Sequence, residues 1–311
     1  MYNKKYSNMT KMINMKYFIL LIVYIPMVTI VRGQTLSEKI AINACEYLDS
    51  IDNFQVLQDS IQPSFGAAMA NVMIESTPEE RTLLGTVEGV LETFKKLFEI
   101  LPNYCYNVRR LMIEDKKLRY YKMSDNKQAN LHFEKGNDLF EKGDFKYAIK
   151  EYESAIKADD NFVYAIDNLA ISYRQLEKFK TAIKYYKKSL DIFPEGNVAL
   201  LNIAVSYSLL EDYENSEKNY GNLIILYPNN PEGYFGLAKM LLIKGDYENA
   251  LDNLFIAHRI YSESDSDYIK DSERLLSLII SKLREVGKMD LLDKKAKEHN
   301  IEIKKNMSKA G

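Results

Sequence analysis

The sequence of 311 residues has few of the side chains from which catalytic and metal sites are built. It contains only two cysteines and three histidines. Two cysteines cannot form a structural zinc site by themselves. His132, His258 and His299 are far apart in the sequence, and none belongs to a metal-binding spacing such as HExxH. No glycine-rich phosphate loop follows a strand pattern. We therefore expect no metal, no cofactor and no catalytic residue.

Blocks of basic residues are also missing after residue 34, and the formal net charge of the chain is −2. A nucleic-acid-binding protein needs a basic face to displace counterions from phosphates. Nucleic acid is therefore not an expected partner. Acidic residues such as Glu151, Glu153, Glu211 and Asp212 are spread as they are on a solvated helix face. An enzyme that uses surface carboxylates stays a remote alternative.

Acidic residues are absent before Glu38, and this segment has the layout of a signal peptide. Four lysines precede an apolar run over residues 17–31. The run is short for a spanning helix, which needs about 17 residues or more, and small residues suit cleavage after Gly33. We expect residues 1–33 to be a signal peptide and the chain to be exported to the periplasm or cell envelope of a Gram-negative bacterium, or secreted. The alternative is an uncleaved membrane anchor that contacts the membrane only through residues 17–31.

Residues 34–123 have the pattern of a small helical module. Thr35 and Glu38 are spaced for a capping box at the start of the first helix. Pro63 predicts a break in the second helical stretch, because proline lacks an N–H and fixes φ. A threonine, a proline and two acids then mark the start of a helix over about residues 77–101. A further helix is expected before the module ends.

Both cysteines fall inside this module. In an oxidising compartment an even pair within one small module indicates a disulfide, and closing a loop of this length stabilises by about 4 kcal/mol in the chain-entropy model. We hypothesise a bond between Cys45 and Cys105. The alternative is two buried free thiols. The stretches NACEYLDSID and LPNYCYNV are similar to small cysteine-bearing helical modules of exported Gram-negative proteins, although Tyr47 stands where a second cysteine is expected.

The segment from residue 129 to residue 264 repeats itself every 34 residues. Four sets of positions keep their side-chain type at that step: Gly136, Ala170, Ala204 and Ala238; Phe145, Phe179, Tyr213 and Tyr247; Ala148, Ala182, Ser216 and Ala250; Tyr152, Tyr186, Tyr220 and Leu254. A period of 34 with this order of small and aromatic residues resembles the tetratricopeptide repeat, a helix-turn-helix unit that stacks into a solenoid.

This resemblance implies an all-α fold, an α-solenoid preceded by the small helical module. Each repeat has two short amphipathic helices that cannot bury their apolar faces alone, so the stack itself forms the core. The expected division is repeats at 129–162, 163–196, 197–230 and 231–264, followed by capping helices and a tail over residues 265–311.

The resemblance also implies a concave groove, lined by the first helix of each repeat. The candidate groove residues are Phe133, Asn137, Tyr164, Asn168, Ile171, Leu201, Asn202, Phe235 and Lys239. Asn137 and Asn168 match positions at which some family members clamp the terminal carboxylate of a peptide. Phe133, Val198 and Asn202 stand where that clamp needs cations. We therefore expect the groove to bind an apolar or aromatic segment.

The predicted function is that of a non-enzymatic scaffold that binds a protein or peptide partner, whose identity the sequence does not specify. Specificity in repeat scaffolds depends on a few groove positions, and the fold alone does not supply it. The alternative is a membrane-anchored envelope assembly protein, in which the groove is filled by the chain's own N-terminal module or C-terminal helix.

Overall fold

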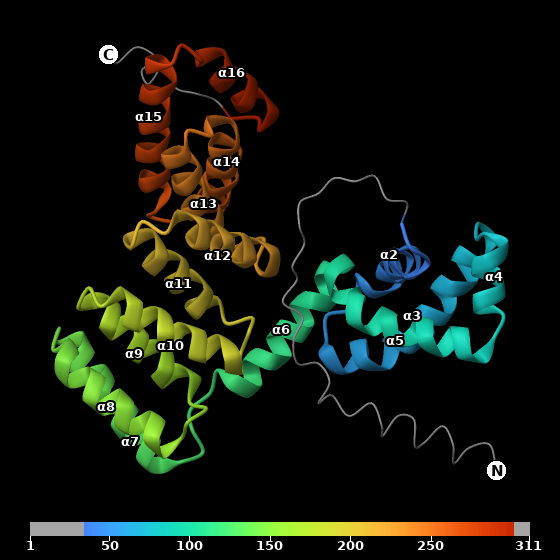
Figure 1. Cartoon of the computed structure of the whole chain (residues 1–311), viewed down its shortest axis with the longest axis horizontal. Helices are drawn as coiled ribbons and strands as arrows, with labels where there is room; N and C mark the ends of the chain where they lie inside the picture. The colour runs from blue at the N-terminus through green and yellow to red at the C-terminus, as the bar shows by residue number, and fades with distance from the viewer. Residues whose placement is uncertain (1–33, 302–311) are drawn as a thin grey trace. The chain divides into compact units, whose positions relative to one another are not determined.

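The computed structural model describes residues 34–301, and this range consists of fifteen α-helices with no strand (Figure 1). The predicted all-α class is confirmed. The predicted signal segment, residues 1–33, lies outside the described residues. Among the helices that are described, none has both the length and the apolar character to cross a membrane. The chain divides into two compact units between Lys116 and Lys117.

The first unit is a small helical module. Its helices are α2 (Leu36–Leu48), α3 (Phe54–Ile74), α4 (Pro78–Leu84), α5 (Val87–Tyr104) and most of α6 (Tyr106–Tyr120). The predicted capping box of Thr35 and Glu38 begins α2, and Thr77 caps α4 as predicted. Helix α2 packs on α3 and α5. The core between them buries the side chains of Ile40 and Phe65 completely.

The predicted break at Pro63 is wrong, because α3 runs through this residue without interruption. Proline removes one backbone hydrogen bond from a helix and crowds the preceding turn. On both sides of Pro63 the helix buries apolar side chains, among them Leu57, Phe65 and Ala68. Burial of apolar area stabilises by about 25 cal/mol per Å². The packed face therefore outweighs the local cost.

The single helix predicted over residues 77–101 is also wrong, because two helices occupy this range. Helix α4 ends before Gly85, and the Thr86 side chain then accepts a hydrogen bond from the backbone of Gly89 to begin α5. A Cβ atom at Gly89 would lie 2.1 Å from the carbonyl oxygen of Leu83. Only glycine permits this close approach. The sequence GTVEG therefore ends helix α4 and begins helix α5.

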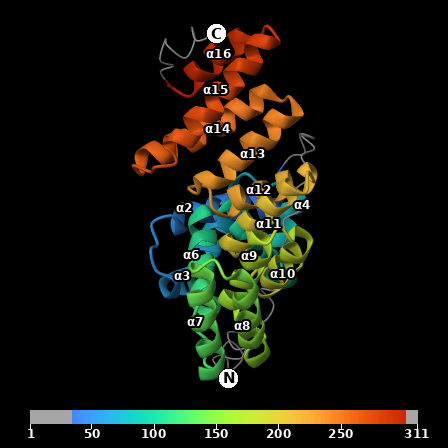
Figure 2. The ribbon, with the colours of Figure 1, turned by 90° about the vertical axis from the view of Figure 1, so that its left-hand side faces the viewer.

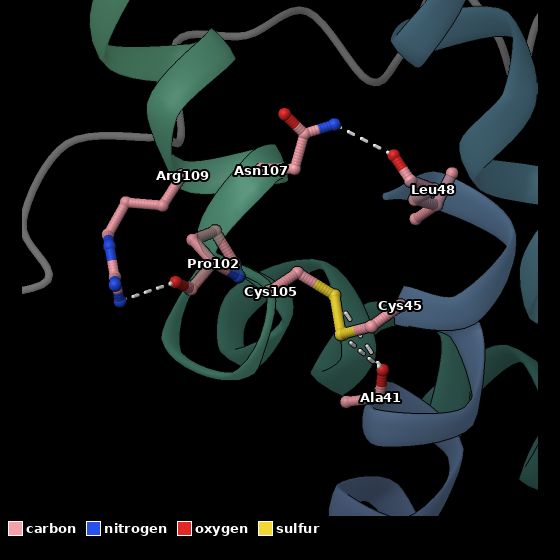
Figure 3. Close-up of a disulfide and its surroundings, with 7 residues drawn as sticks. All are labelled: Ala41, Cys45, Leu48, Pro102, Cys105, Asn107 and Arg109. Atoms are coloured by element: carbon pink, nitrogen blue, oxygen red, sulfur yellow. Dashed lines mark hydrogen bonds between the residues drawn. A yellow bond between two sulfur atoms is a disulfide. The ribbon is translucent and has the colours of Figure 1, made fainter. Parts of the chain in front are cut away.

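A disulfide joins the two ends of this module. Cys45 in α2 and Cys105 between α5 and α6 are bonded, with their Cα atoms 5.4 Å apart, in agreement with the predicted pairing (Figure 3). Beside it, Asn107 Nδ2 donates hydrogen bonds to the carbonyl oxygens of Leu48 (2.9 Å) and Ile51 (2.6 Å). The end of α2 is therefore held to the start of α6 both covalently and by hydrogen bonds.

The second unit is a solenoid of helix pairs that stack one after another (Figures 1 and 2). The first helices of the four pairs are α7 (Lys127–Glu141), α9 (Val163–Gln175), α11 (Asn197–Leu209) and α13 (Pro231–Lys244). The second helices are α8 (Phe145–Ala158), α10 (Phe179–Ile192), α12 (Tyr213–Leu226) and α14 (Tyr247–Glu263). Helices α15 (Ile269–Glu285) and α16 (Met289–Glu298) pack on α14 at the end of the stack.

The 34-residue period sets the helix boundaries and the core. Each second helix begins at one of the predicted aromatic positions, from Phe145 to Tyr247. Small residues let neighbouring helices approach closely, because a Cβ atom at Gly136 would lie 2.5 Å from the ring of Tyr152. The predicted sets that begin with Gly136, Ala148 and Tyr152 are buried in all four repeats, whereas the aromatic set that begins with Phe145 is partly buried. The solenoid predicted from the repeat is therefore confirmed.

The turn inside each repeat also follows this period. Gly143, Glu177, Glu211 and Gly245 occupy equivalent turn positions, and all four have a positive φ, between 59° and 79°. The left-handed conformation costs a non-glycine residue roughly 1–2 kcal/mol. The turns of repeats two and three therefore carry backbone strain that the other two turns avoid.

This difference predicts opposite effects for two substitutions in equivalent turns. Gly245→Ala should lower the free energy of unfolding by about 1 kcal/mol, because alanine must adopt a positive φ. Glu177→Gly should leave it unchanged or raise it by up to about 1 kcal/mol, since the relief of strain outweighs the entropy that glycine loses. Denaturant unfolding of both variants measures this. Equal destabilisation by both would contradict the strained turn.

The disulfide predicts a redox-dependent stability of the first unit. Reduction should lower the free energy of unfolding of that unit by about 4 kcal/mol, because the reduced chain regains the entropy of an open loop. Unfolding with and without reductant measures the loss, and the Cys45→Ala/Cys105→Ala variant serves as a control that reductant should not affect. Two free thiols per chain in denaturant without reductant would show that the bond does not form.

Candidate functional site

The first helices of the repeats carry all the predicted groove residues. Phe133 and Asn137 lie on α7; Tyr164, Asn168 and Ile171 on α9; Leu201 and Asn202 on α11; Phe235 and Lys239 on α13. Helix α11 contacts both α9 and α13. The first helices of repeats two, three and four therefore lie side by side and form one continuous face. We call this face the groove.

The predicted amides act mainly as connections inside the solenoid. Asn137 Oδ1 accepts hydrogen bonds from the hydroxyl of Tyr152 (2.8 Å) and from Asn168 Nδ2 (2.9 Å), which joins repeats one and two. Asn202 Nδ2 donates to the carbonyl oxygen of Val198 in its own helix (2.9 Å). Two of these three amide nitrogens, those of Asn168 and Asn202, therefore each donate one hydrogen bond within the chain.

Phe133 lies deeper than the other predicted aromatic residues. Its side chain is 8% exposed, and its ring contacts the rings of Tyr152, Phe162 and Tyr164 at centroid distances of 6.0, 4.9 and 6.1 Å. This cluster fills the space between repeats one and two. Phe133 is therefore a core residue that packs against Tyr164, whereas Tyr164 is only partly buried.

The remaining predicted residues are partly buried or exposed. Ile171 packs on the core of repeat two, and Leu201 packs on the core of repeat three. Phe235 packs edge-on against Tyr261 at 6.2 Å, and the exposed Lys239 ammonium lies 5.8 Å from its ring centroid. The groove thus offers accessible apolar surface along α9, α11 and α13.

A pair of tyrosines that the sequence analysis did not select occupies the α9 part of the groove. Tyr121 follows α6 and packs edge-on against Tyr164 at 4.8 Å and against Phe193 at 5.7 Å. Tyr120 stacks on Phe193, also at 5.7 Å. The Tyr121 hydroxyl donates a hydrogen bond to Asp167. We call Tyr164, Asp167 and Phe193 the tyrosine subsite.

The chain that follows Tyr121 is bonded to repeat one. The backbone N–H of Ser124 donates to Asn130 Oδ1 (2.9 Å), and Asn130 Nδ2 donates to the Ser124 carbonyl oxygen (2.8 Å). The Ser124 hydroxyl donates to Asp159, and Asn126 Nδ2 donates to the carbonyl oxygen at the end of α8 (2.9 Å). These bonds hold the segment on the solenoid and direct the preceding tyrosines to the subsite.

Asp167 is a buried acid that lies near two hydroxyl groups. The residue is 2% exposed, and burial raises the pKa of its carboxyl to about 6, while the hydroxyls of Ser189 and Tyr121 act to lower that pKa. Tyr121 bonds Oδ2. Within residues 34–301, Oδ1 has no hydrogen bond of good geometry, and neither has the Ser189 hydroxyl. Folded proteins rarely leave buried polar atoms unpaired, because each costs about 1–3 kcal/mol.

The Tyr121 phenol remains a donor at all ordinary pH values. Burial, followed by the negative charge of Asp167 and the hydrogen bond to it, raises the pKa of Tyr121 far above its usual range. The pair therefore combines a protonated phenol with a carboxyl group that is mostly ionised at neutral pH. A hydrogen bond to a charged group is stronger than one between neutral groups.

One residue of the subsite, Asp167, is recognisable in the sequence, although the repeat pattern does not point to it. Asp167 is the only acid in the apolar stretch VYAIDNLAIS. An acid at a core-facing position needs a partner, and the tyrosine pair just before the first repeat supplies one. Such a partner cannot be found from periodicity, because Tyr120 and Tyr121 lie outside the repeats.

The three histidines each have a separate partner. His132 Nδ1 lies 2.7 Å from Glu151, His258 Nδ1 lies 2.8 Å from the Ser272 hydroxyl, and His299 Nε2 lies 2.8 Å from Asp252. Burial lowers the pKa of His258. In the described part of the chain, no three histidine, cysteine or acidic side chains are grouped so that they could hold a metal ion.

Comparison with known proteins identifies the repeats. Residues 133–197 and 201–257 match the family described as tetratricopeptide repeat. These two segments cover most of the four repeats predicted from the 34-residue period. A search of curated proteins found no relative that matches the chain.

Several solved structures are similar to part of this chain. The first TPR of Spaghetti (RPAP3), bound to the HSP90 peptide SRMEEVD, is 26% identical; the match covers 39% of this chain and 96% of that chain, with a TM-score of 0.38. MamA is 19% identical over 55% of this chain and 91% of its own, with a TM-score of 0.47. YrrB, described as a TPR protein with an unusual peptide-binding site, is 17% identical over 60% and 91%, with a TM-score of 0.43.

The buried pair predicts the titration of Asp167. The carboxyl should titrate near pH 6, and Tyr121→Phe should raise its pKa further, because the lost hydrogen bond favoured the charged form. Carboxyl ¹³C NMR measures both values, with Asp167→Asn used to assign the signal. A carboxyl that titrates near pH 4 in both proteins would contradict the buried pair.

The same shift predicts how Asp167 affects stability. The pKa in the folded chain, about 6, lies above the unfolded value, so the folded state binds the proton more tightly. The contribution of Asp167 to stability is therefore complete below about pH 4 and is lost as the pH rises through about 6. As the pH rises from about 4 through about 6, the free energy of unfolding of the wild type should therefore fall relative to that of Asp167→Asn.

Proposed function

The chain carries tetratricopeptide repeats over residues 133–197 and 201–257, and from this premise we propose that it is a non-enzymatic scaffold whose groove binds a segment of a partner protein or peptide. The observation that carries this proposal is the tyrosine subsite. Tyr120 and Tyr121 come from outside the repeats, and the groove receives their side chains through ring contacts and one hydrogen bond. A partner segment can use the same chemistry.

The rest of the groove favours an apolar or aromatic segment. Four partly buried apolar side chains are distributed over α9, α11 and α13: Ile171, Leu201, Val205 and Leu237. Covering such a surface stabilises by about 25 cal/mol per Å² of apolar area removed from water. The bond between Asn168 and Asn137 uses the side-chain nitrogen of Asn168. The side-chain oxygen of Asn168 could therefore accept a hydrogen bond from a main-chain amide of a bound segment.

We also propose that the chain acts outside the cytoplasm. Residues 1–33 have the layout of a signal peptide. Cys45 and Cys105 lie at bonding distance, and such a bond persists in an oxidising compartment. The periplasm or envelope of a Gram-negative bacterium fits both features. The alternative is a membrane-anchored assembly protein that keeps residues 17–31.

A second function is favoured by the same tyrosine contacts. A groove that the chain fills permanently would serve as a structural joint rather than as a binding site. The hydrogen bonds of Ser124 and Asn126 to repeat one and α8 are consistent with a fixed segment. In that case the scaffold would meet its partners through other surfaces, and substitutions in the groove would leave partner binding unchanged.

Affinity capture with matched variants tests the proposal. The double variant Leu201→Glu/Phe235→Glu should lose the partner that the wild-type chain captures, because two charges are placed on the apolar groove. Ile225→Glu is the control, since this side chain lies on the second helix α12 and is 40% exposed. Circular dichroism confirms that all three proteins keep their helices.

Mass spectrometry of the captured material identifies the partner and the first residue of the chain. Undiminished capture by the double variant would reject the groove as the binding site. Export predicts a chain that begins at Gln34. A chain that still contains residues 17–31 would reject cleavage and support the membrane-anchored alternative.

A further inference from the structure

The tyrosine subsite has a definite shape and chemistry. Two aromatic rings, Tyr164 and Phe193, form its walls, and the Asp167 carboxylate lies where the hydroxyl of an inserted tyrosine reaches it. Phenylalanine would fill the same space but would leave Asp167 Oδ2 without its donor. An unpaired buried acceptor costs about 1–3 kcal/mol. The subsite is therefore built to select a tyrosine over a phenylalanine.

A second hydroxyl also acts on Asp167. Tyr121 donates to Oδ2, and the Ser189 hydroxyl lowers the pKa of the same carboxyl. Ser189 lies on α10, within the repeats, whereas Tyr121 comes from outside them. The donor that an incoming tyrosine would replace is therefore Tyr121 alone.

From these observations we infer that the tyrosine subsite recognises a tyrosine-bearing segment of a partner protein, and that Tyr120 and Tyr121 occupy it until that segment replaces them. The inference rests on the proposed function, because it names the partner chemistry of one part of the groove. The expected ligand presents two consecutive aromatic residues. The first stacks on Phe193, as Tyr120 does, and the second is a tyrosine that donates to Asp167.

The internal occupant sets the affinity that a partner must reach. A segment tethered next to its site has an effective concentration of about millimolar. The apparent affinity of an incoming ligand equals its intrinsic affinity multiplied by the fraction of molecules in which the subsite is free. A partner therefore needs contacts beyond the subsite, and the partly buried side chains of Ile171 on α9 and Leu201 on α11 are available for them. Removing the two tyrosine side chains should remove this competition.

Peptide titration of the full chain tests the inference. The probe is a peptide of residues 117–126, KLRYYKMSDN, and the receptor is the variant Tyr120→Ala/Tyr121→Ala, followed by NMR. The peptide should bind this variant at least about tenfold more tightly than it binds the wild type, because the subsite is empty. The peptide KLRYFKMSDN, which lacks only the second hydroxyl, should bind about tenfold more weakly than the probe.

Two controls keep the test decisive. The peptide KLRAAKMSDN should not bind, and Asp167→Leu in the emptied variant should abolish the preference for tyrosine over phenylalanine. If the double alanine variant loses its helical signal, Tyr121→Phe replaces it as the receptor, since this change keeps the ring and removes only the hydroxyl. Equal binding of the probe to the wild type and to the emptied chain, or binding of KLRAAKMSDN, would overturn the inference.

The inference and the proposed function can fail separately. If Leu201→Glu/Phe235→Glu abolishes partner capture but the emptied chain binds no probe, the groove binds its partner and the subsite does not recognise tyrosine. If the probe binds the emptied chain but capture is insensitive to the groove variant, the subsite has the inferred chemistry and the wider groove is not the partner site.

Discussion

Close contact between a small residue on one helix and an aromatic ring on its neighbour is the interaction on which the solenoid depends. Gly136 lies against Tyr152 and Gly236 against Tyr220, and in both places an added Cβ atom would overlap the ring, at 2.5 and 2.2 Å. Without these contacts each pair of short helices would leave its apolar face in water. The positions of Gly136 and Tyr152 recur every 34 residues, so successive helix pairs stack alike, and the first helices of repeats two, three and four lie side by side. The groove is a consequence of that stacking.

Much of this arrangement can be predicted from the sequence, because periodic contacts leave a periodic pattern. The aromatic residues from Phe145 to Tyr247 mark the starts of the second helices, and the small positions between them are buried. Local rules were less reliable where packing opposes them. Helix α3 passes through Pro63 because its face is buried, and α5 restarts at Thr86 because Gly89 permits a close crossing.

The binding chemistry was harder to predict than the stack. The Tyr121–Asp167 contact joins residues 46 positions apart, and only one of the two lies in a repeat. Periodicity indicates which residues face the groove, but it does not indicate what enters it. Phe133 illustrates the same limit, because it occupies a groove position in the repeat and yet packs under Tyr164 in the core. A lone acid in an apolar helix was the available signal.

Tyr121 in the tyrosine subsite both stabilises the fold and occupies part of the proposed binding surface. A buried carboxylate is costly unless it is bonded, so Asp167 makes the first repeats depend on Tyr121. A double-mutant cycle with Tyr121→Phe and Asp167→Leu, measured by denaturant unfolding at about pH 8, tests this dependence most directly. The account predicts a coupling of about 1.5–3 kcal/mol, the value of a hydrogen bond to a charged group. A coupling near zero would show that the chain does not hold Tyr121 in the groove.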